Sequence, residues 1–344
     1  MTKKLAIRIV GYGAIGAFLY VAIALSVFLF SMVVLKQGVV FSNKLMNSYQ
    51  RVIYFNGGRK LWQNEPECVI FDQDLLYKPK IGECKFENVE FKTTLNFDER
   101  GRISKNKTDR PGIAVVGDSF AMGWGVNDNE TYASVLEEMT GRPVYNLGVS
   151  SYGTYRELLR LEKSGLIDKI DTIILQYCDN DLFENKDKTS ANPTLTVTLE
   201  KFNSMFGSAP PAPYASLKLW LSEALSIPKR EIKTALRPSR RNLLDFSSHY
   251  DGINAVLAKF PWVTGKKVII FYVNADGKKF DNFNEVIQRP RNNAAMYVDL
   301  APAPGTDFYY VLDDHLTKTG HKRIAEKLMH LVSPSADSGS TMQN

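Results

Sequence analysis

Residues 112–120, with the sequence GIAVVGDSF, decide the fold that we predict for this chain. A short apolar run passes directly into a glycine, an acid and a serine, as at the end of a buried parallel strand that precedes a helix. Further apolar runs of strand length follow at 144–147, 172–177, 267–273 and 296–300. Helix-like segments separate the runs, so strands and helices alternate along the chain. We therefore predict an α/β domain whose parallel sheet is covered on both faces.

Polar segments suited to acyl chemistry follow these strands. Ser119 stands where the first strand meets a helix start, whose backbone N–H groups can stabilise an oxyanion. His315 has an acid two residues before it, close enough for a carboxylate to orient the imidazole as a base. A glycine-bearing loop contains Gly148, and Asn180 offers a neutral side-chain donor. Because loops that follow parallel strands meet at one edge of the sheet, the fold would bring these segments together.

The four segments resemble the SGNH (GDSL-type) hydrolase superfamily, whose sequence blocks carry Ser, Gly, Asn and His. The matching blocks are GDSF with Ser119, NLGVSSYGT with Gly148, CDND with Asn180 and DDHLTKTGH with His315. The resemblance covers residues 112–332 and implies a three-layer α/β/α, flavodoxin-like domain that works without metal or cofactor. It implies that Ser119 is the nucleophile and His315 the general base and acid. The N–H groups of Ser119 and Gly148 and the Asn180 amide would form the oxyanion hole.

Two positions depart from the family's usual pattern. The family often has its acid three residues before the histidine, where this chain has Leu312. We predict that Asp313 completes the triad, with Asp314 as the alternative acid. Cys178 stands where the third block often has glycine, and its side chain would narrow the pocket. We expect Cys178 to be a buried structural thiol rather than a nucleophile, because no histidine lies near it in sequence.

The N-terminal region is apolar for an unusually long distance. Between Arg8 and Lys36 lie 27 uncharged residues, more than the roughly 20 that cross a bilayer core. The run exceeds the apolar region of a signal peptide, about 7–15 residues, and lacks a small-residue cleavage site, so we predict an uncleaved anchor. Its glycines match the dinucleotide pattern G-x-G-x-x-G, but no acid follows before Glu65, so they fit a membrane helix better. Basic residues packed before the run favour a cytoplasmic N-terminus and a periplasmic or extracellular catalytic domain.

The net charge of +6 belongs to this same end of the chain. Residues 1–64 contain eight Lys or Arg and no acid, whereas the rest contains 35 basic and 37 acidic residues. We therefore expect a membrane rather than a nucleic-acid partner. With 44% hydrophobic and 23% charged residues, the chain can build a core and is not globally disordered.

We divide the chain into a stub and anchor (1–35), a juxtamembrane stalk and β-rich neck (36–110), the catalytic domain (111–333) and a flexible tail (334–344). An insertion at about 184–264 contains a basic run, which we interpret as a solvated face; an anionic polymer or lipid headgroups are the alternatives.

The cysteines and histidines indicate which cellular compartment the chain suits and whether it contains a metal-binding motif. Cys68 and Cys84 could form a disulfide in an oxidising compartment, or remain two free thiols. No C-x-x-C or H-E-x-x-H pattern in the sequence predicts a metal site.

These observations favour a membrane-anchored, extracytoplasmic serine ester hydrolase that acts through an acyl-enzyme on acyl, particularly acetyl, esters of envelope carbohydrate or lipid. The first alternative is an O-acyltransferase that passes the acyl group to a polysaccharide hydroxyl. The second is a non-catalytic subunit of an envelope complex, against which the joint presence of Ser119, His315, Asn180 and a candidate acid argues. We also expect a partner from envelope biosynthesis or secretion.

Overall fold

The computed structural model describes most of the chain, in the ranges 3–103, 110–190, 198–206, 217–236, 243–244, 246–273, 279–280, 295–303 and 307–333. The predicted tail at 334–344 and parts of the predicted insertion lie outside these residues.

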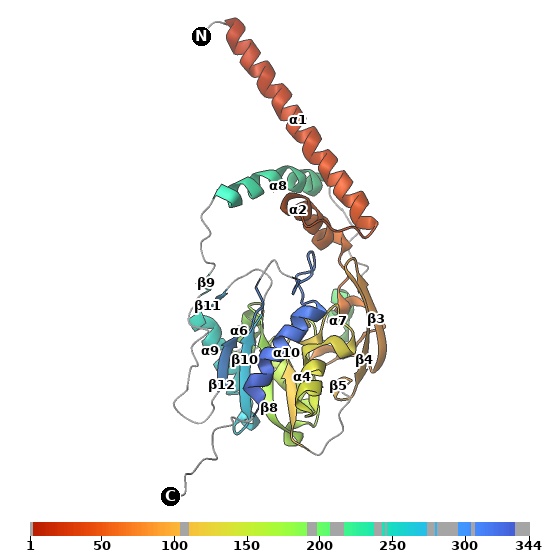
Figure 1. Ribbon diagram of the computed structural model, residues 1–344, viewed down its shortest axis with the longest axis vertical. Helices are drawn as coiled ribbons and strands as arrows, with labels where there is room; N and C mark the ends of the chain where they lie inside the picture. Colours follow the sequence, from red (N-terminus) through yellow and green to blue (C-terminus); the bar gives the residue numbers. More distant parts are fainter. Residues whose placement is uncertain are drawn as a thin grey trace, which may run out of the picture.

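A mostly parallel sheet of eight strands forms the centre of the molecule, in the order β12-β10-β8-β6-β7-β5-β4-β3 (Figure 1). Its parallel strands are β6 (Gly112–Val116), β7 (Val144–Asn146), β8 (Ile170–Tyr177), β10 (Lys267–Tyr272) and β12 (Ala295–Asp299). Each lies within two residues of a predicted apolar run, and β6 and β8 are buried along nearly their whole length, as strands covered on both faces must be. In chain order, their spatial arrangement is 2-1-3-4-5, the order of doubly wound flavodoxin-like sheets.

Antiparallel strands continue this sheet beyond β7. They are β3 (Gly82–Asn88), β4 (Phe91–Asp98) and β5 (Gly101–Arg102). We expected this stretch to form a neck before the catalytic domain, and the structure instead places it in the domain's own sheet. The physical reason is the open edge that β7 would otherwise present, which β5 covers by pairing Arg102 with Asn146.

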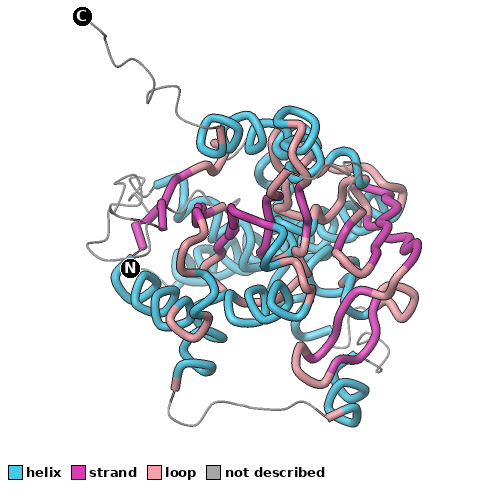
Figure 2. The backbone as a smooth tube through the Cα atoms, turned by 90° about the horizontal axis from the view of Figure 1, so that it is seen from below, coloured by secondary structure: helices cyan, strands magenta, loops and turns pink. Residues whose placement is uncertain are grey.

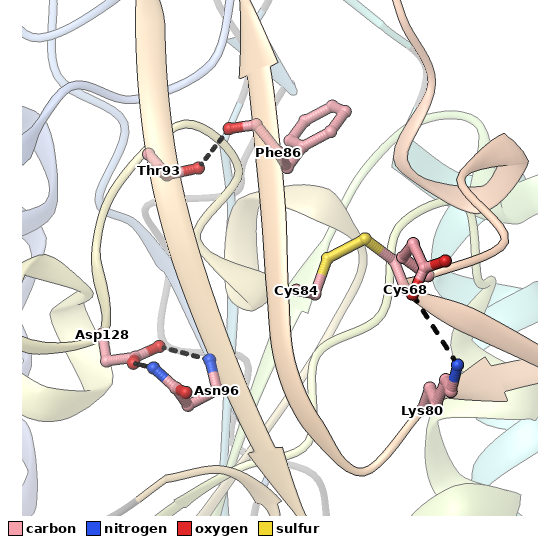
Figure 3. The surroundings of a disulfide bond; sticks show 8 residues. Cys68, Lys80, Cys84, Phe86, Thr93, Asn96 and Asp128 are labelled. Atoms are coloured by element: carbon pink, nitrogen blue, oxygen red, sulfur yellow. Dashed lines mark hydrogen bonds and ion pairs between the residues drawn. A yellow bond between two sulfur atoms is a disulfide. The ribbon is translucent and has the colours of Figure 1, made fainter.

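A small hairpin precedes β3. It consists of β1 (Val69–Asp72) and β2 (Leu76–Pro79). A disulfide between Cys68 and Cys84 ties the start of this hairpin to β3 (Figure 3).

Helices cover both faces of the sheet, as Figure 2 shows for the view from below. One face carries α4 (Tyr132–Thr140) and α10 (Lys318–Val332), whose apolar side chains share a core cluster with β6, β8 and β10. The other face carries α5 (Thr154–Lys163) and α9 (Phe246–Leu257). Short elements complete the described part: α3 (Ser119–Met122), α6 (Asp181–Thr189), α7 (Leu199–Phe206), β9 (Leu243–Leu244), β11 (Lys279–Phe280), η1 (Tyr54–Gly58), η2 (Trp62–Asn64), η3 (Asp128–Glu130), η4 (Ile167–Lys169) and η5 (Pro261–Val263).

The N-terminal helix α1 (Lys3–Lys36) extends away from the sheet (Figure 1). Its segment Val10–Lys36 is long and apolar enough to cross a membrane. At the base of α1, α2 (Lys44–Ile53) and α8 (Leu217–Leu236) pack against it. A hydrophobic cluster joins the three helices, and it includes Phe28, Leu35, Tyr49, Ile53, Tyr54, Ala224, Ile227 and Leu312. The last of these residues lies in the loop before α10, so the helices at the base of α1 also contact the α/β domain.

Candidate active site

Ser119 lies where β6 ends and α3 begins. Gly117 makes this turn with a φ of +152°, and a Cβ there would lie 2.7 Å from both Ala121 Cβ and Gln176 Oε1. Glycine is therefore the residue that the turn accommodates. Asp118 caps α3 by accepting a hydrogen bond from the Phe120 N–H at 2.9 Å. These local constraints hold the serine at the edge of the sheet where polar loops follow the parallel strands.

Ser119, His315 and Asp313 form a hydrogen-bonded chain. Ser119 Oγ lies 2.7 Å from His315 Nε2, and His315 Nδ1 lies 2.5 Å from Asp313 Oδ1. The three residues are 9%, 7% and 1% exposed, so the chain of contacts is shielded from bulk water. The structure thus brings Ser119 to an acid–histidine pair almost 200 positions later in the sequence, in the arrangement that activates a serine hydroxyl.

The adjacent acid Asp314 has a different partner. It adopts a left-handed φ of +65°, and its carboxylate forms an ion pair with Arg51. Of the two candidate acids that the sequence offered, Asp313 is therefore the one that contacts the imidazole.

Aromatic rings enclose His315. The Trp124 ring stacks on the imidazole with ring centroids 4.8 Å apart and an interplanar angle of 16°, and Phe120 packs at the same distance. The loop that carries Trp124 is fixed by Arg102 of β5, whose buried guanidinium donates to the carbonyls of Met122, Gly123 and Val126. The antiparallel extension of the sheet thereby supports the site.

The predicted oxyanion-hole residues are only partly assembled. The Ser119 N–H occupies the first position of α3, where a helical N–H has no intrahelical partner. The Gly148 N–H, however, donates to Asn146 Oδ1 at 3.1 Å, and a Cβ at Gly148 would lie 2.3 Å from Met122 N. Asn180 is exposed at the start of α6, and within the described residues it makes no hydrogen bond to the triad.

The charges around the triad favour an ionised Asp313. Burial alone would raise the pKa of Asp313, but the His315 imidazole, the Arg59 guanidinium and the Tyr54 hydroxyl together lower it below its usual range. Burial also raises the pKa of Asp118 to about 6. The pKa of the triad acid is thus lowered, whereas the pKa of the acid next to Ser119 is raised.

Several residues at the site carry no motif and were not predicted from the sequence. Tyr54 and Arg59 both contact the Asp313 carboxylate, although they lie about 250 residues before it. Glu90, in the turn between β3 and β4, accepts hydrogen bonds from the backbone N–H groups of residues 311–313 at 2.7–2.9 Å. Local sequence patterns hold no information about such distant contacts.

The described residues include candidate metal ligands and one thiol outside a disulfide. None of their His, Cys, Asp and Glu side chains form a group of three or more that could hold a metal ion. Cys178 is half-buried and not disulfide-bonded, and burial raises the pKa of its thiol well above the usual value, which disfavours the thiolate that a nucleophile requires.

No family model matches this chain, and no curated protein matches it. Among solved structures, the chain is similar to a protein from Desulfitobacterium hafniense DCB-2 that is assigned to the G-D-S-L family of lipolytic proteins. The two share 13% identity over 65% of this chain and 100% of that chain, with a TM-score of 0.30.

Proposed function

We propose that this protein is a membrane-anchored serine ester hydrolase of the SGNH type. One observation carries the proposal: the hydrogen-bonded chain from Ser119 Oγ through His315 to Asp313 Oδ1. A serine hydroxyl is a poor nucleophile until a base takes its proton, and an imidazole is an effective base when a carboxylate orients it. The 2-1-3-4-5 order of the parallel strands and the position of the serine after the first of them are consistent with this assignment.

The reaction would proceed in two halves. Ser119 Oγ attacks the ester carbonyl while His315 Nε2 accepts the hydroxyl proton, and the resulting oxyanion accepts a hydrogen bond from the Ser119 N–H. His315 then donates the proton to the departing alcohol oxygen, the carbon–oxygen ester bond breaks and an acyl-enzyme forms. Water attacks this intermediate in the same way, releases a carboxylic acid and regenerates Ser119. We propose that Gly148 and Asn180 join the oxyanion hole when substrate binds. Binding would displace the hydrogen bond that the Gly148 N–H now donates to Asn146 Oδ1.

We propose acyl esters of envelope carbohydrate or lipid, particularly acetyl esters, as the substrates. The aromatic side chains of Phe120 and Trp124 pack against His315, and we propose that they present an apolar surface to a short acyl group. The apolar helix α1 supports attachment to a membrane, and the Cys68–Cys84 disulfide supports an oxidising, extracytoplasmic compartment for the α/β domain.

A second candidate function is O-acyl transfer to a sugar hydroxyl through the same acyl-enzyme. The low exposure of Ser119 and His315 favours it, because a site that admits little water slows hydrolysis of the intermediate. Turnover of an aryl acetate with and without a sugar acceptor separates the two functions. Acceleration and acetylation of the acceptor would identify a transferase, whereas release unaffected by any acceptor would identify a hydrolase.

A fluorophosphonate probe tests whether Ser119 is a nucleophile at all. We expect the detergent-solubilised full-length protein to be labelled, the Ser119→Ala variant to remain unlabelled and the Ser204→Ala control on α7 to behave like the wild type. If the wild type resists labelling where a control serine hydrolase reacts, the chain is a binding module and the enzyme proposal is wrong.

A further inference from the structure

The chain segment that follows α1 lies against the loop that carries the catalytic acid. The Tyr54 hydroxyl, at the start of η1, donates a hydrogen bond to Asp313 Oδ2. Arg59, just after η1, donates from Nη2 to Asp313 Oδ1 at 3.2 Å. His315 Nδ1 contacts that same Oδ1 atom. Both oxygens of the acid are therefore held, one of them entirely by the N-terminal segment.

The burial of these groups shows why such partners are needed. The Asp313 side chain has no exposed surface, and Tyr54 is also fully buried. A buried carboxylate is costly unless hydrogen bonds and an opposite charge compensate it. The Arg59 guanidinium supplies that charge, and it also lies 4.9 Å from the Trp124 ring that stacks on His315. Arg59 thus touches the surroundings of both the acid and the base.

The backbone of the same loop is held by the same segment. Arg51 of α2 donates to the carbonyls of Val311 and Leu312 at 3.3 and 3.2 Å and pairs with Asp314. The Leu312 side chain belongs to the cluster that contains Phe28 and Leu35 of α1. The loop is consequently seated on the apolar base of α1 as well as on α2 and η1.

We propose that Tyr54 and Arg59 are positioning residues for the Asp313–His315 pair, so that the segment linking α1 to the sheet is part of the catalytic unit rather than a passive stalk. This inference rests on the proposed serine hydrolase function. Removal of either contact would let the Asp313 carboxylate rotate or move, and the imidazole that it orients would lose its alignment with Ser119 Oγ. Misplacement of a catalytic group by about 1 Å can lower a rate by roughly 100-fold.

Full-length Tyr54→Phe and Arg59→Gln variants test the inference. The matched control is Tyr49→Phe on α2, which likewise removes one buried tyrosine hydroxyl. That hydroxyl donates a hydrogen bond to the Ala224 carbonyl at 3.1 Å and does not contact Asp313. The measurements are the rate of fluorophosphonate labelling at Ser119, kcat and KM for an aryl acetate as functions of pH, and the melting temperature.

We expect both variants to lower kcat and the labelling rate by roughly 10- to 100-fold with little change in KM. Any loss of activity that accompanies protonation of Asp313 should begin at a higher pH in both variants, because Arg59 and Tyr54 both lower the pKa of Asp313. Arg59→Lys should recover part of the loss, and Tyr49→Phe should match the wild type.

The inference is overturned if folded Tyr54→Phe and Arg59→Gln react at the wild-type rate with an unchanged pH profile. It is equally overturned if Tyr49→Phe loses as much activity as Tyr54→Phe, since the loss would then reflect packing of α2. Failure of the wild type to react at all would instead contradict the proposed function. Tyr54→Phe removes only the hydroxyl and keeps the buried ring. Its result therefore tests the inference even if the Arg59→Gln variant fails to fold.

Discussion

Asp313 and Asp314 are neighbours in the sequence but have different environments. Asp313 is buried and contacts His315, Tyr54 and Arg59, whereas Asp314 turns toward Arg51 through a left-handed backbone conformation. The left-handed backbone at Asp314 thus accompanies a carboxylate that pairs with Arg51 and not with the imidazole. This separation lets point substitutions distinguish their roles.

We expect Asp313→Asn and Asp314→Asn to differ by orders of magnitude in activity. Asn at 313 cannot stabilise the imidazolium and favours the wrong imidazole tautomer, an effect that lowers kcat by about 10⁴-fold in the serine-protease triad. Asp314→Asn loses only a partly exposed ion pair and should retain kcat within about threefold. Steady-state hydrolysis of an aryl acetate measures both. Equal losses in the two variants would contradict the assignment of Asp313.

The residues at the site show what a sequence can and cannot specify. Ser119 and His315 were predictable because a strand followed by a polar turn, and a histidine beside an acid, are local patterns. The hydrogen bond from the Gly148 N–H to Asn146 Oδ1 was not predictable. A short polar loop contains several donors and acceptors, and its sequence does not show which of them bond to each other. Tyr54 and Arg59 could not be found because their role comes entirely from contacts across the folded chain.

At the scale of elements, apolar runs predicted the parallel strands well because burial on both faces requires continuous apolar sequence. The sequence predicted a β-rich neck within 36–110, but it did not predict that β3 to β5 belong to the same sheet as the parallel strands. Their alternating pattern indicates one buried face, and it carries no information about which edge they join. Only the folded arrangement shows that β5 covers β7.

The contact between α4 and α10 makes a prediction about acid stability. His321 of α10 is buried, and its Nδ1 accepts a hydrogen bond from the Tyr132 N–H at the start of α4, at 3.1 Å. Burial, with smaller contributions from Arg102 and His315, lowers the pKa of His321 from 6.5 to about 3. The unfolded chain therefore binds a proton that the folded protein excludes, and the free energy of unfolding should fall as the pH drops from 6.5 toward 3.

Urea unfolding at several pH values measures this effect. We expect His321→Asn, which keeps an acceptor, to reduce the slope of stability against pH by up to ~1.4 kcal/mol per pH unit in that window. The control His330→Asn, on the exposed side of the same helix, should keep the wild-type slope. A slope unchanged by His321→Asn would show that this histidine is not buried in its neutral form.

At the scale of the whole molecule, the apolar helix and the α/β domain are joined through one cluster of side chains rather than a flexible linker. The composition of the chain predicted two distinct regions, because the excess positive charge lies around the apolar run and the rest of the chain is nearly neutral. The close packing of α2 and α8 against α1 was not predictable, because an amphipathic pattern indicates an apolar face but carries no information about which helix covers that face.

The Cys68–Cys84 disulfide gives a whole-molecule test of compartment and stability. We expect alkylation of the protein from cells, unfolded in urea without a reductant, to modify Cys178 alone among the three cysteines. A Cys68→Ala/Cys84→Ala variant should lose about 3 kcal/mol of unfolding free energy, as expected for closing a loop of about 15 residues. The control Cys178→Ser should retain its disulfide. Alkylation of all three cysteines would contradict an oxidising compartment.

If Ser119 forms an acyl-enzyme, that intermediate can be trapped. The full-length protein is mixed with an aryl acetate, quenched in acid within the first turnovers, digested and analysed by mass spectrometry. We expect one acetyl group on the peptide that contains Ser119, absent from Ser119→Ala and strongly reduced in Asp313→Asn. Turnover without acetylation of Ser119, or acetylation that persists at another residue in Ser119→Ala, would contradict a nucleophilic role for Ser119.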